Sequence, residues 1–372
     1  MEKGERAQRG EENTTIDING DLLEAILSHL PLIHLLAAYH VSQNWRYAVQ
    51  SSLSNPSRIK PWLIAYVQNS RNPSMVTTCA YDPESRVWID IPRTTMPLRY
   101  SPILSSHSNL IYMHTPSKLA FSVDPLSSTW HEVDGPKVWR SDPIVALIGS
   151  HVVIAGGSHD FELDPLAVEI YDARARTWKT CQPMPDILKV CAATTWLSVA
   201  ASDLKMYLIE KNSATFCSFD PNTRTWGDTL ELRPNGSIFF SLIAFSKNRL
   251  VLIGLTGDME NVESLRIWEV NSETFDCNEI GKMPSIMLGG LIDPCSSPSS
   301  INISMADNLV YVYNLSNLKV IVYCELSDCS CNWGSIQNSA ITDQNQLHRF
   351  TFTCSKVGIH DLLKAFGSGK RR

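Results

Sequence analysis

The residue types most often used for chemistry are present in number, but they are not grouped as reactive sites require. The chain has ten cysteines and ten histidines. The one close cysteine cluster is Cys324, Cys329 and Cys331, in the stretch YCELSDCSCNW. A zinc site normally combines C-x-x-C pairs or added histidines. The spacing therefore favours cysteines in strands and turns, with zinc as the alternative, and we expect reduced thiols and no bound metal.

The known catalytic and nucleotide-binding signatures are missing. The sequence contains no G-x-S-x-G, no G-x-x-x-x-G-K, no H-E-x-x-H and no Rossmann fingerprint. His29, His34 and His40 fall in a helical pattern, where exposed helix positions are a simpler explanation than catalysis. Gly156-Gly157 is predicted to form a turn at a strand end rather than a phosphate-binding loop. The sequence therefore predicts a protein without catalytic activity and without a cofactor.

Composition and charge narrow the class of partner. Apolar residues make up 44% and charged residues 19% of the 372-residue chain, which is typical of a folded globular protein. The net charge of -6 gives no basic footprint for nucleic acid or an anionic membrane. Residues 1–16 are polar and are expected to be disordered, and no apolar run approaches the roughly 18 residues of a membrane helix. We expect a protein partner, in the cytoplasm or nucleus.

One short pattern recurs along most of the chain. In YDARARTW (171–178), an aromatic residue and an acid open the pattern and a tryptophan closes it. Similar stretches are YDPESRVW (81–88), VDPLSSTW (123–130), FDPNTRTW (219–226) and WEVNSETF (268–275). Successive closing aromatic residues are 42 to 49 residues apart. This period predicts a β-propeller in which each repeat forms one four-stranded blade.

Each copy is predicted to form one hairpin of a blade. Tyr171 is expected to end one strand, Asp172 to begin the turn, and Trp178 to begin the next strand. The two aromatic side chains are expected to fill the space between neighbouring blades. The residues assigned to these structural positions, with the double glycine, are Tyr81, Asp82, Trp88, Asp124, Trp130, Gly156, Gly157, Tyr171, Asp172, Trp178, Asp220, Trp226 and Phe275.

The copies predict a mainly β fold with six blades. The segment 285–337 holds Trp333 after the strand-like LKVIVYCEL and is long enough for a sixth blade. The first copy has too few residues before Trp88 for four strands, whereas LHRFTFTCSKV near the C-terminus is a strand without a blade. We predict that this strand closes the first blade, because an open sheet edge invites unwanted pairing. The expected propeller spans residues 59–362, followed by a flexible tail over 363–372.

Residues 17–58 follow a helical period instead. In DLLEAILSHLP the apolar residues fall on one helical face, and Pro31 is the expected stop. A second apolar set runs from Leu32 to Tyr39, and a third short helix is expected around Trp45. Three short helices in about forty residues cannot bury all this apolar surface among themselves. Part of it is therefore expected to meet a partner.

The two parts resemble two known modules. The propeller repeats resemble kelch repeats in their aromatic-acid and Trp positions, in Met-Pro after the tryptophan, and in the double glycine. The stretch INGDLLEAILSHLPLIHLLAAYHVSQNWRYAV resembles an F-box, and the combination is similar to the plant F-box/kelch-repeat family. This resemblance implies a non-catalytic, substrate-recognition subunit of an SCF-type ubiquitin ligase. Its implied contacts with a Skp1-type adaptor, and through it a cullin, are Leu22, Leu23, Ile26, Leu27, Leu30, Pro31, Leu35, Leu36 and Trp45.

The resemblance also implies that the propeller binds a protein substrate for ubiquitination and proteasomal degradation. Some family members recognise biosynthetic enzymes, such as those of phenylpropanoid and flavonoid metabolism. Contacts are expected from the loops that enter each blade and from the mid-blade loops. The candidates are Arg99, Tyr100, Trp139, Arg140, His159, Phe161 and Asp258.

Two other interpretations stay open. Ile18-Asn19 stands where the F-box family has Leu-Pro, which favours a kelch interaction scaffold whose degenerate F-box no longer engages a ligase. The helical segment is also compatible with a cap packed on the propeller. Retention of the apolar residues from Leu22 to Leu36 at helical spacing favours the ligase subunit.

Overall fold

The chain divides into two compact units, Met1–Ile59 and Lys60–Arg372. The computed structural model describes residues 20–54, 59–92, 96–108, 110–124, 126, 129–157, 164–293, 296–327, 330–338 and 348–367. Across these ranges, every helix is too short or too polar to span a lipid bilayer. The expectations for residues 1–16 and for Ile18-Asn19 lie outside the described residues.

The first unit is helical, as predicted. Its helices are α1 (Gly20–Leu27), α2 (Leu32–Ala38) and α3 (Gln43–Ser52). Leu23 and Leu27, one turn apart on α1, are buried, as are Leu35 of α2 and Val49 of α3. The Ser42 side chain accepts a hydrogen bond from the Trp45 amide (3.3 Å), which caps the first turn of α3. A small apolar core therefore joins the three helices.

The described residues of the second unit form six antiparallel sheets, as predicted, but only four of them have the predicted four strands, since blade 2 has three and blade 4 has five. Blade 1 is β24 (His348–Ser355), β1 (Trp62–Asn69), β2 (Val76–Asp82) and β3 (Val87–Ile91); blade 2 is β4 (Ile111–His114), β5 (Lys118–Ser122) and β6 (His131–Asp134); blade 3 is β7 (Ile144–Ile148), β8 (His151–Ala155), β9 (Val168–Asp172) and β10 (Thr177–Thr180). Blade 4 is β11 (Leu197–Ala201), β12 (Met206–Glu210), β13 (Thr215–Asp220), β14 (Thr225–Trp226) and β15 (Leu230–Glu231); blade 5 is β16 (Ile238–Ser246), β17 (Arg249–Gly257), β18 (Val262–Val270) and β19 (Cys277–Lys282); blade 6 is β20 (Ile301–Ala306), β21 (Leu309–Asn314), β22 (Asn317–Leu326) and β23 (Cys331–Gln337).

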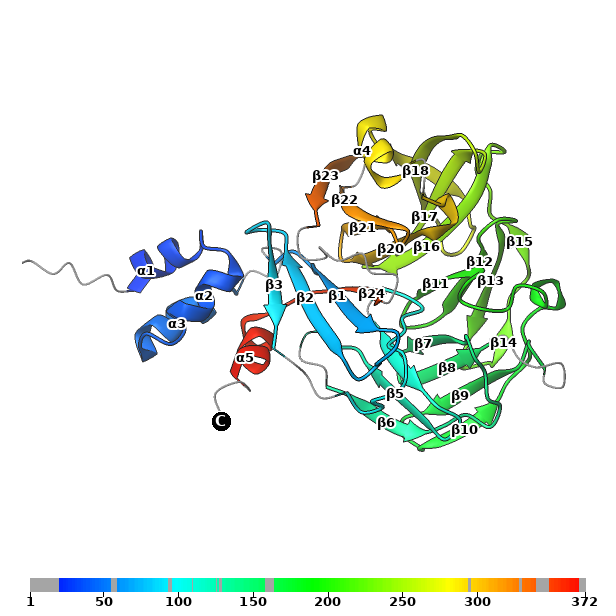
Figure 1. The fold of residues 1–372 in the computed structure, drawn as a ribbon, viewed down its shortest axis with the longest axis horizontal. Helices are drawn as coiled ribbons and strands as arrows, with labels where there is room; N and C mark the ends of the chain where they lie inside the picture. The colour runs from blue at the N-terminus through cyan, green and yellow to red at the C-terminus, as the bar shows by residue number, and fades with distance from the viewer. Residues whose placement is uncertain are drawn as a thin grey trace, which may run out of the picture. The chain divides into compact units, whose positions relative to one another are not determined.

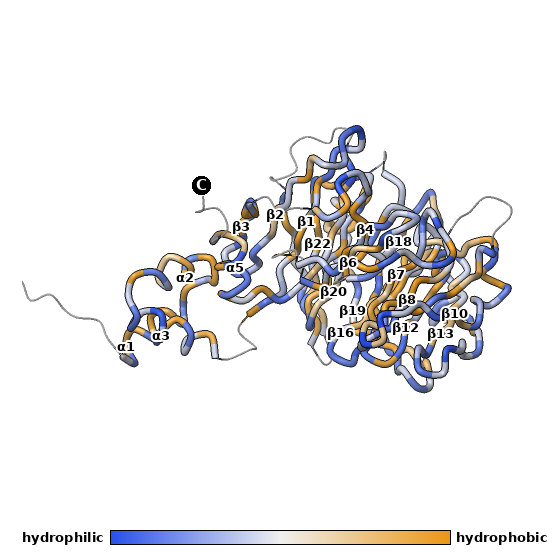
Figure 2. The backbone as a smooth tube through the Cα atoms, turned by 90° about the horizontal axis from the view of Figure 1, so that it is seen from below, coloured by the Kyte–Doolittle hydropathy of each residue, from blue (hydrophilic) through white to orange (hydrophobic). Residues whose placement is uncertain are grey.

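The sheets are arranged as a ring. The first strands of successive blades contact one another in the order β7, β11, β16, β20 and β24. Figure 1 shows the blades set around a common centre, and Figure 2 shows apolar residues (orange) along the strands with polar residues (blue) mostly at the turns. Alternating the apolar strands with polar turns allows each blade to bury both faces against its neighbours.

The C-terminal strand closes the ring, as predicted. β24 pairs antiparallel with β1, with Leu63 opposite Cys354. In Figure 1, β24 (red) accordingly lies beside β1 (blue). The Phe352 ring of β24 is buried, and its centroid lies 4.4 Å from that of Tyr313 in blade 6. The strand therefore completes the blade 1 sheet and fills the seam between blades 1 and 6.

Three of the five copies of the recurring stretch form the predicted hairpin, and in blade 2 the strand begins at His131, opposite Phe121, so Trp130 lies just before it. Tyr171, the residue before the last of β9, lies opposite Trp178 of β10, and the two ring centroids are 5.3 Å apart. The Asp172 carboxylate accepts hydrogen bonds from the amides of Arg174 and Ala175 (both 3.0 Å), and Arg176 takes a positive φ of 53°. The acid thus shapes the turn by bonding its backbone. Equivalent turns begin at Asp82 and Asp220, with Arg86 and Arg224 at positive φ.

In blade 5 the predicted position of the turn was wrong by two residues. Sequence alone places Glu269 at the turn and Phe275 at the start of the next strand. In the structure Asn271 begins the turn, accepting hydrogen bonds from two backbone amides, and Phe275 is at the positive-φ position inside it. Val270 pairs with Cys277, so a cysteine holds the strand position of the tryptophan. The Phe275 ring still lies 5.1 Å from Phe216 of blade 4.

Two short helices were not anticipated. α4 (Ser285–Leu291) follows Pro284, and α5 (Ile359–Gly367) occupies part of the segment predicted to be a flexible tail from residue 363. Ile359, Leu362 and Ala365 of α5 are buried, and their spacing places them on one helical face. Burial of this face explains why the chain continues as a helix past residue 362. Residues 368–372 lie outside the described residues.

A buried ion pair anchors the segment that enters blade 3. The Arg140 side chain is 2% exposed, and its Nη1 donates to Glu169 Oε2 of β9 at 3.3 Å. Glu169 also accepts hydrogen bonds from the backbone amides of Lys137 (3.0 Å) and Val138 (3.1 Å). One carboxylate therefore fixes the path of residues 137–140 against the blade.

Closing the ring should depend on the apolar seam at β24. Replacing Phe352→Ala removes a buried aromatic ring, so we expect the free energy of unfolding to fall by about 3–5 kcal/mol. Urea denaturation followed by tryptophan fluorescence measures it. Leu204→Ala, at an exposed position in the β11–β12 turn, is the control and should change stability by less than about 0.5 kcal/mol. Similar losses in both variants would contradict the role of β24.

The Arg140–Glu169 pair predicts a second difference in stability. Arg140→Met leaves a buried carboxylate without its cation, so we expect a loss of about 3–5 kcal/mol in thermal or urea unfolding. The double variant Arg140→Met/Glu169→Gln should be more stable than the single variant, because the neutral amide removes the buried charge. Lys118→Met, which breaks the exposed pair with Asp134, should destabilise the protein far less, because water screens that pair. If Arg140→Met is as stable as Lys118→Met, the buried Arg140–Glu169 pair does not stabilise the fold as proposed.

Candidate partner-binding surfaces

The helical unit exposes apolar side chains on α1. Leu22 is 58% and Ile26 is 43% exposed, and the two are one turn apart, so they share a face that we call the α1 apolar face. Val41 and Tyr47 are also largely exposed. Large exposed apolar side chains on so small a unit are typical of a surface that meets a partner.

The nine residues predicted to bind an adaptor occupy three environments. Leu23, Leu27 and Leu35 are buried within the described structure, so they hold the helices together. Only Leu22 and Ile26 are clearly exposed. The other four are half-buried: Leu30, Pro31, Leu36 and Trp45. Sequence periodicity identified the apolar set, but it did not separate the side that packs inward from the side left open.

Tyr47 was not among the residues predicted to bind the adaptor. Its neighbour Arg46 lies over the Tyr39 ring, with 5.0 Å between the guanidinium carbon and the ring centroid. That contact ties α3 to the end of α2 and leaves Tyr47 on the exposed side. An aromatic residue inside a short polar helix is the one sequence signal that was available for it.

The propeller presents its longer connections at one end. Antiparallel strands alternate in direction, so the connections that enter each blade and the mid-blade connections open on the same side, which we call the loop end. Tyr100, which is 83% exposed, and its neighbour Arg99 lie in the connection entering blade 2. Asp258 lies in the mid-blade connection of blade 5 and accepts hydrogen bonds from the amides of Glu260 and Asn261. These three residues are accessible, as a contact role requires.

Two further candidates are structural rather than open to solvent. Arg140 was predicted as a substrate contact, but it is buried against Glu169 because that carboxylate needs a cation. Trp139 is half-buried, with its ring 4.9 Å from the His114 ring. The His114 Nε2 atom is 3.0 Å from the Arg140 carbonyl, and burial lowers the pKa of His114. His159 and Phe161 lie outside the described residues.

The double glycine is explained by close packing. Gly157 has a φ of +105°, and a Cβ atom built on it would lie 2.7 Å from the Cβ of Arg140. Gly156 also has a positive φ, of +64°. The pair is therefore needed where the chain leaves β8 beside the buried arginine, as the predicted strand-end turn requires.

The loop end also carries exposed apolar residues that were not predicted from the sequence. The connection between blades 3 and 4, residues 181–196, is anchored by buried Met184 and Leu188. From it project Ile187, Val190 (93% exposed) and Trp196. Met184-Pro185 was recognised as a repeat feature, but the exposed residues around it lack a repeat signature. Of these, Trp196 is the residue type most typical of an interface anchor.

Two members of the cysteine cluster, Cys324 and Cys331, lie in strands of blade 6. Cys324 is buried in β22, and the Cys331 thiol contacts the Ile280 carbonyl at 3.5 Å. Hydrogen bonding between Cys324 and Cys331 lowers the pKa of Cys331 and raises that of Cys324. Within the described ranges, no three His, Cys, Asp or Glu side chains are grouped to hold a metal ion. Cys329 lies outside those ranges.

The comparisons with known proteins agree with both units. The F-box domain family matches residues 17–56. An F-box/kelch-repeat protein of Arabidopsis thaliana is 40% identical over 372 residues, covering 96% of this chain and 94% of that protein. A second F-box/kelch-repeat protein of Arabidopsis thaliana is 27% identical over 209 residues, covering 50% of this chain and 77% of that protein. The chain belongs to the plant F-box/kelch-repeat family.

Proposed function

We propose that the protein is the substrate-recognition subunit of an SCF-type ubiquitin ligase. The helical unit binds a Skp1-type adaptor, and through it a cullin, while the propeller binds a protein to be ubiquitinated and degraded. The observation that carries this proposal is the F-box match over residues 17–56, on helices that leave Leu22 and Ile26 exposed beside a buried core. The work of this subunit takes place in the cytoplasm, the nucleus or both.

The α1 apolar face supplies the adaptor contact. Full burial of a leucine or isoleucine side chain contributes about 1.5–3 kcal/mol, so two such residues can account for a large part of a specific interface. The half-buried Leu36 and Trp45 extend the apolar area beyond this face. The buried leucines act differently, because they preserve the helical packing that presents the face.

The propeller supplies the substrate contact at its loop end. Trp196, in the connection entering blade 4, and Tyr100, in the connection entering blade 2, are exposed aromatic side chains of the types best suited to anchor a protein surface, and the exposed Val190 adds apolar area. The protein makes and breaks no bond itself. Holding a substrate beside a ubiquitin-loaded enzyme raises the effective concentration of the substrate lysines at the transfer site. A biosynthetic enzyme of phenylpropanoid or flavonoid metabolism is the substrate class that the family resemblance suggests.

An interaction scaffold without a ligase is the second candidate. It rests on Ile18-Asn19, where the F-box family has Leu-Pro, and these residues lie outside the described structure. The two candidates make opposite statements about the adaptor, so adaptor binding separates them.

The ligase proposal predicts that the α1 apolar face binds the adaptor. We expect the full-length chain to bind a purified Skp1-type adaptor in isothermal titration calorimetry. Leu22→Ala/Ile26→Ala should weaken the complex by about tenfold or more, since roughly 1.4 kcal/mol of lost interface energy corresponds to a factor of ten. The thermal midpoint of the variant should stay close to that of the unchanged chain, because both side chains are exposed.

Two controls make this test specific. Leu204→Ala removes an equally exposed leucine from the propeller and should leave adaptor binding unchanged. Leu35→Ala should weaken binding together with helical stability, because Leu35 is buried. A well-folded chain that does not bind the adaptor favours the scaffold instead.

A further inference from the structure

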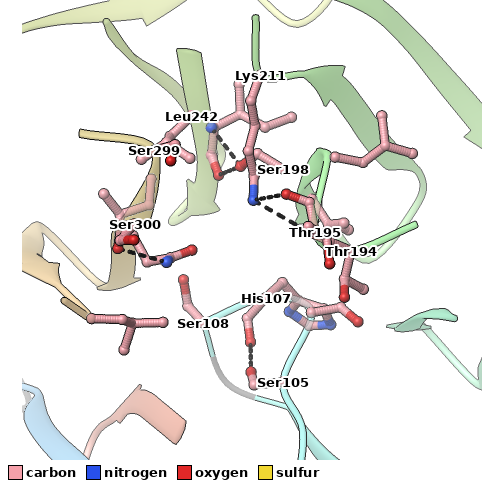
Figure 3. Close-up of a pocket in the computed structure, with 17 residues that line it drawn as sticks. Ser105, His107, Ser108, Thr194, Thr195, Ser198, Lys211, Leu242, Ser299 and Ser300 are labelled. Carbon is pink, nitrogen blue, oxygen red and sulfur yellow. Dashed lines mark hydrogen bonds between the residues drawn. The ribbon is translucent and has the colours of Figure 1, made fainter. Parts of the chain in front are cut away.

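A polar cavity lies among the innermost strands of the propeller. Its volume is about 360 Å³, which is within the usual range for small-molecule sites. It is lined from β11, β16 and β20 and by residues 105–108, which precede β4. Figure 3 shows these elements around the cavity, with hydroxyl-bearing side chains and Lys211 on its walls. Four blades thus contribute to one site at the centre of the ring.

The segment 105–108 crosses between blades and shapes the cavity. The Ser108 hydroxyl accepts a hydrogen bond from the Met305 amide of blade 6 (2.8 Å), and the Ser108 carbonyl accepts one from the Cys354 amide of blade 1 (2.7 Å). The Ser106 hydroxyl accepts from the Val145 amide of blade 3 (3.0 Å). These bonds hold the segment at several points, so this wall of the cavity is built into the fold.

Lys211 is the cationic side chain on the cavity wall. It lies in the mid-blade connection of blade 4 and is 8% exposed. Its Nζ atom donates to the carbonyls of Thr195 (2.9 Å) and Thr194 (3.2 Å). An ammonium group has three N–H donors, and among the described residues these two carbonyls are its acceptors. Figure 3 shows the Nζ atom directed into the cavity.

In the described structure, the nearby carboxylates accept hydrogen bonds from groups other than the Lys211 ammonium group. Asp142 accepts hydrogen bonds from the Thr194 hydroxyl, the Thr195 hydroxyl (2.8 Å) and the Thr195 amide (3.1 Å). Glu210 accepts from the amides of Asn212 (3.1 Å) and Ser213. Neither carboxylate lines the cavity, and the described lining residues include no acidic side chain. The third donor of Lys211 therefore faces a space rich in hydroxyl groups.

The charge state of Lys211 can respond to what occupies the cavity. Burial lowers the pKa of Lys211 to about 8, although Asp142 and Glu210 act to raise it. The group is still mostly protonated at pH 7. A negatively charged occupant would favour the protonated form further, because an opposite charge nearby raises the pKa of an amine.

We propose that the central cavity of the propeller binds a small oxyanion, a carboxylate or a phosphate group, through Lys211 and the surrounding hydroxyls. An oxyanion supplies the acceptor that the ammonium group needs, and the Ser300 hydroxyl can donate to one of its other oxygens. The site goes beyond the proposed ligase role and does not depend on it, because every contact lies inside the propeller.

The test uses the full chain with sulfate and succinate as probes. Sulfate stands for a tetrahedral oxyanion and succinate for a carboxylate, and neither changes charge between pH 7 and pH 9.5. We expect at least one of them to raise the thermal midpoint at pH 7 in a saturable way, beyond chloride at equal ionic strength. A response to sulfate alone assigns a phosphate-type ligand, and a response to succinate alone assigns a carboxylate.

Lys211→Met should weaken binding of the active probe by tenfold or more. Lys205→Met, an exposed lysine in the β11–β12 turn of the same blade, is the matched control and should bind as the unchanged chain does. If Lys211→Met does not fold, the unchanged chain still decides the question. Between pH 7 and pH 9.5 its affinity should fall on the order of thirtyfold if only the protonated amine binds, because the pKa of the unoccupied amine is about 8.

Three results overturn the proposal. The first is a midpoint that responds to both probes no more than to chloride. The second is a folded Lys211→Met variant that binds as tightly as Lys205→Met. The third is an affinity that does not change between pH 7 and pH 9.5.

Discussion

Burial of apolar surface between adjacent blades is the interaction on which the propeller depends. A single four-stranded sheet has two faces to cover, and a neighbouring blade covers such a face at five seams of this propeller. Separate apolar clusters lie between blades 2 and 3, 3 and 4, 4 and 5, 5 and 6, and 6 and 1. The seam between blades 6 and 1 is completed by β24, which comes from the far end of the chain. These seams fix the positions of the blades and therefore of the loops that connect their strands.

The repeated turn was the part of the fold that sequence could predict. An acid whose side chain bonds the turn backbone, followed by a residue at positive φ and then an aromatic residue, is a local arrangement, so it leaves a local signature at Asp172 and Trp178. Blade 5 shows the limit of that signature. Asn271 shapes its turn as an aspartate does elsewhere, but the nearby Glu269 and Phe275 imitate the pattern two residues out of place. The pairing of the strands, in which Val270 lies opposite Cys277, places Asn271 rather than Glu269 at the start of the turn.

The candidate sites were harder to predict because exposure depends on the whole fold. The apolar residues of the first two helices were found by their spacing, but only the packed helices separate buried Leu23 from exposed Leu22. Arg140 was expected on the surface as a typical interface residue, and it is instead buried opposite Glu169, 29 positions further along the chain. Lys211 was not predicted as a site residue, because its position at the centre of the ring follows from the arrangement of the blades.

In the proposed function, the helical unit binds the adaptor and the propeller binds the substrate. Hydrogen exchange tests the adaptor contact most directly. Exchange of backbone amides in the full-length chain is measured with and without a saturating Skp1-type adaptor. Adaptor binding through the α1 apolar face should slow exchange in α1 and α2, around Leu22, Ile26 and Leu36, and leave exchange in the propeller strands unchanged. Unchanged exchange in these helices, or protection confined to the propeller, would contradict it.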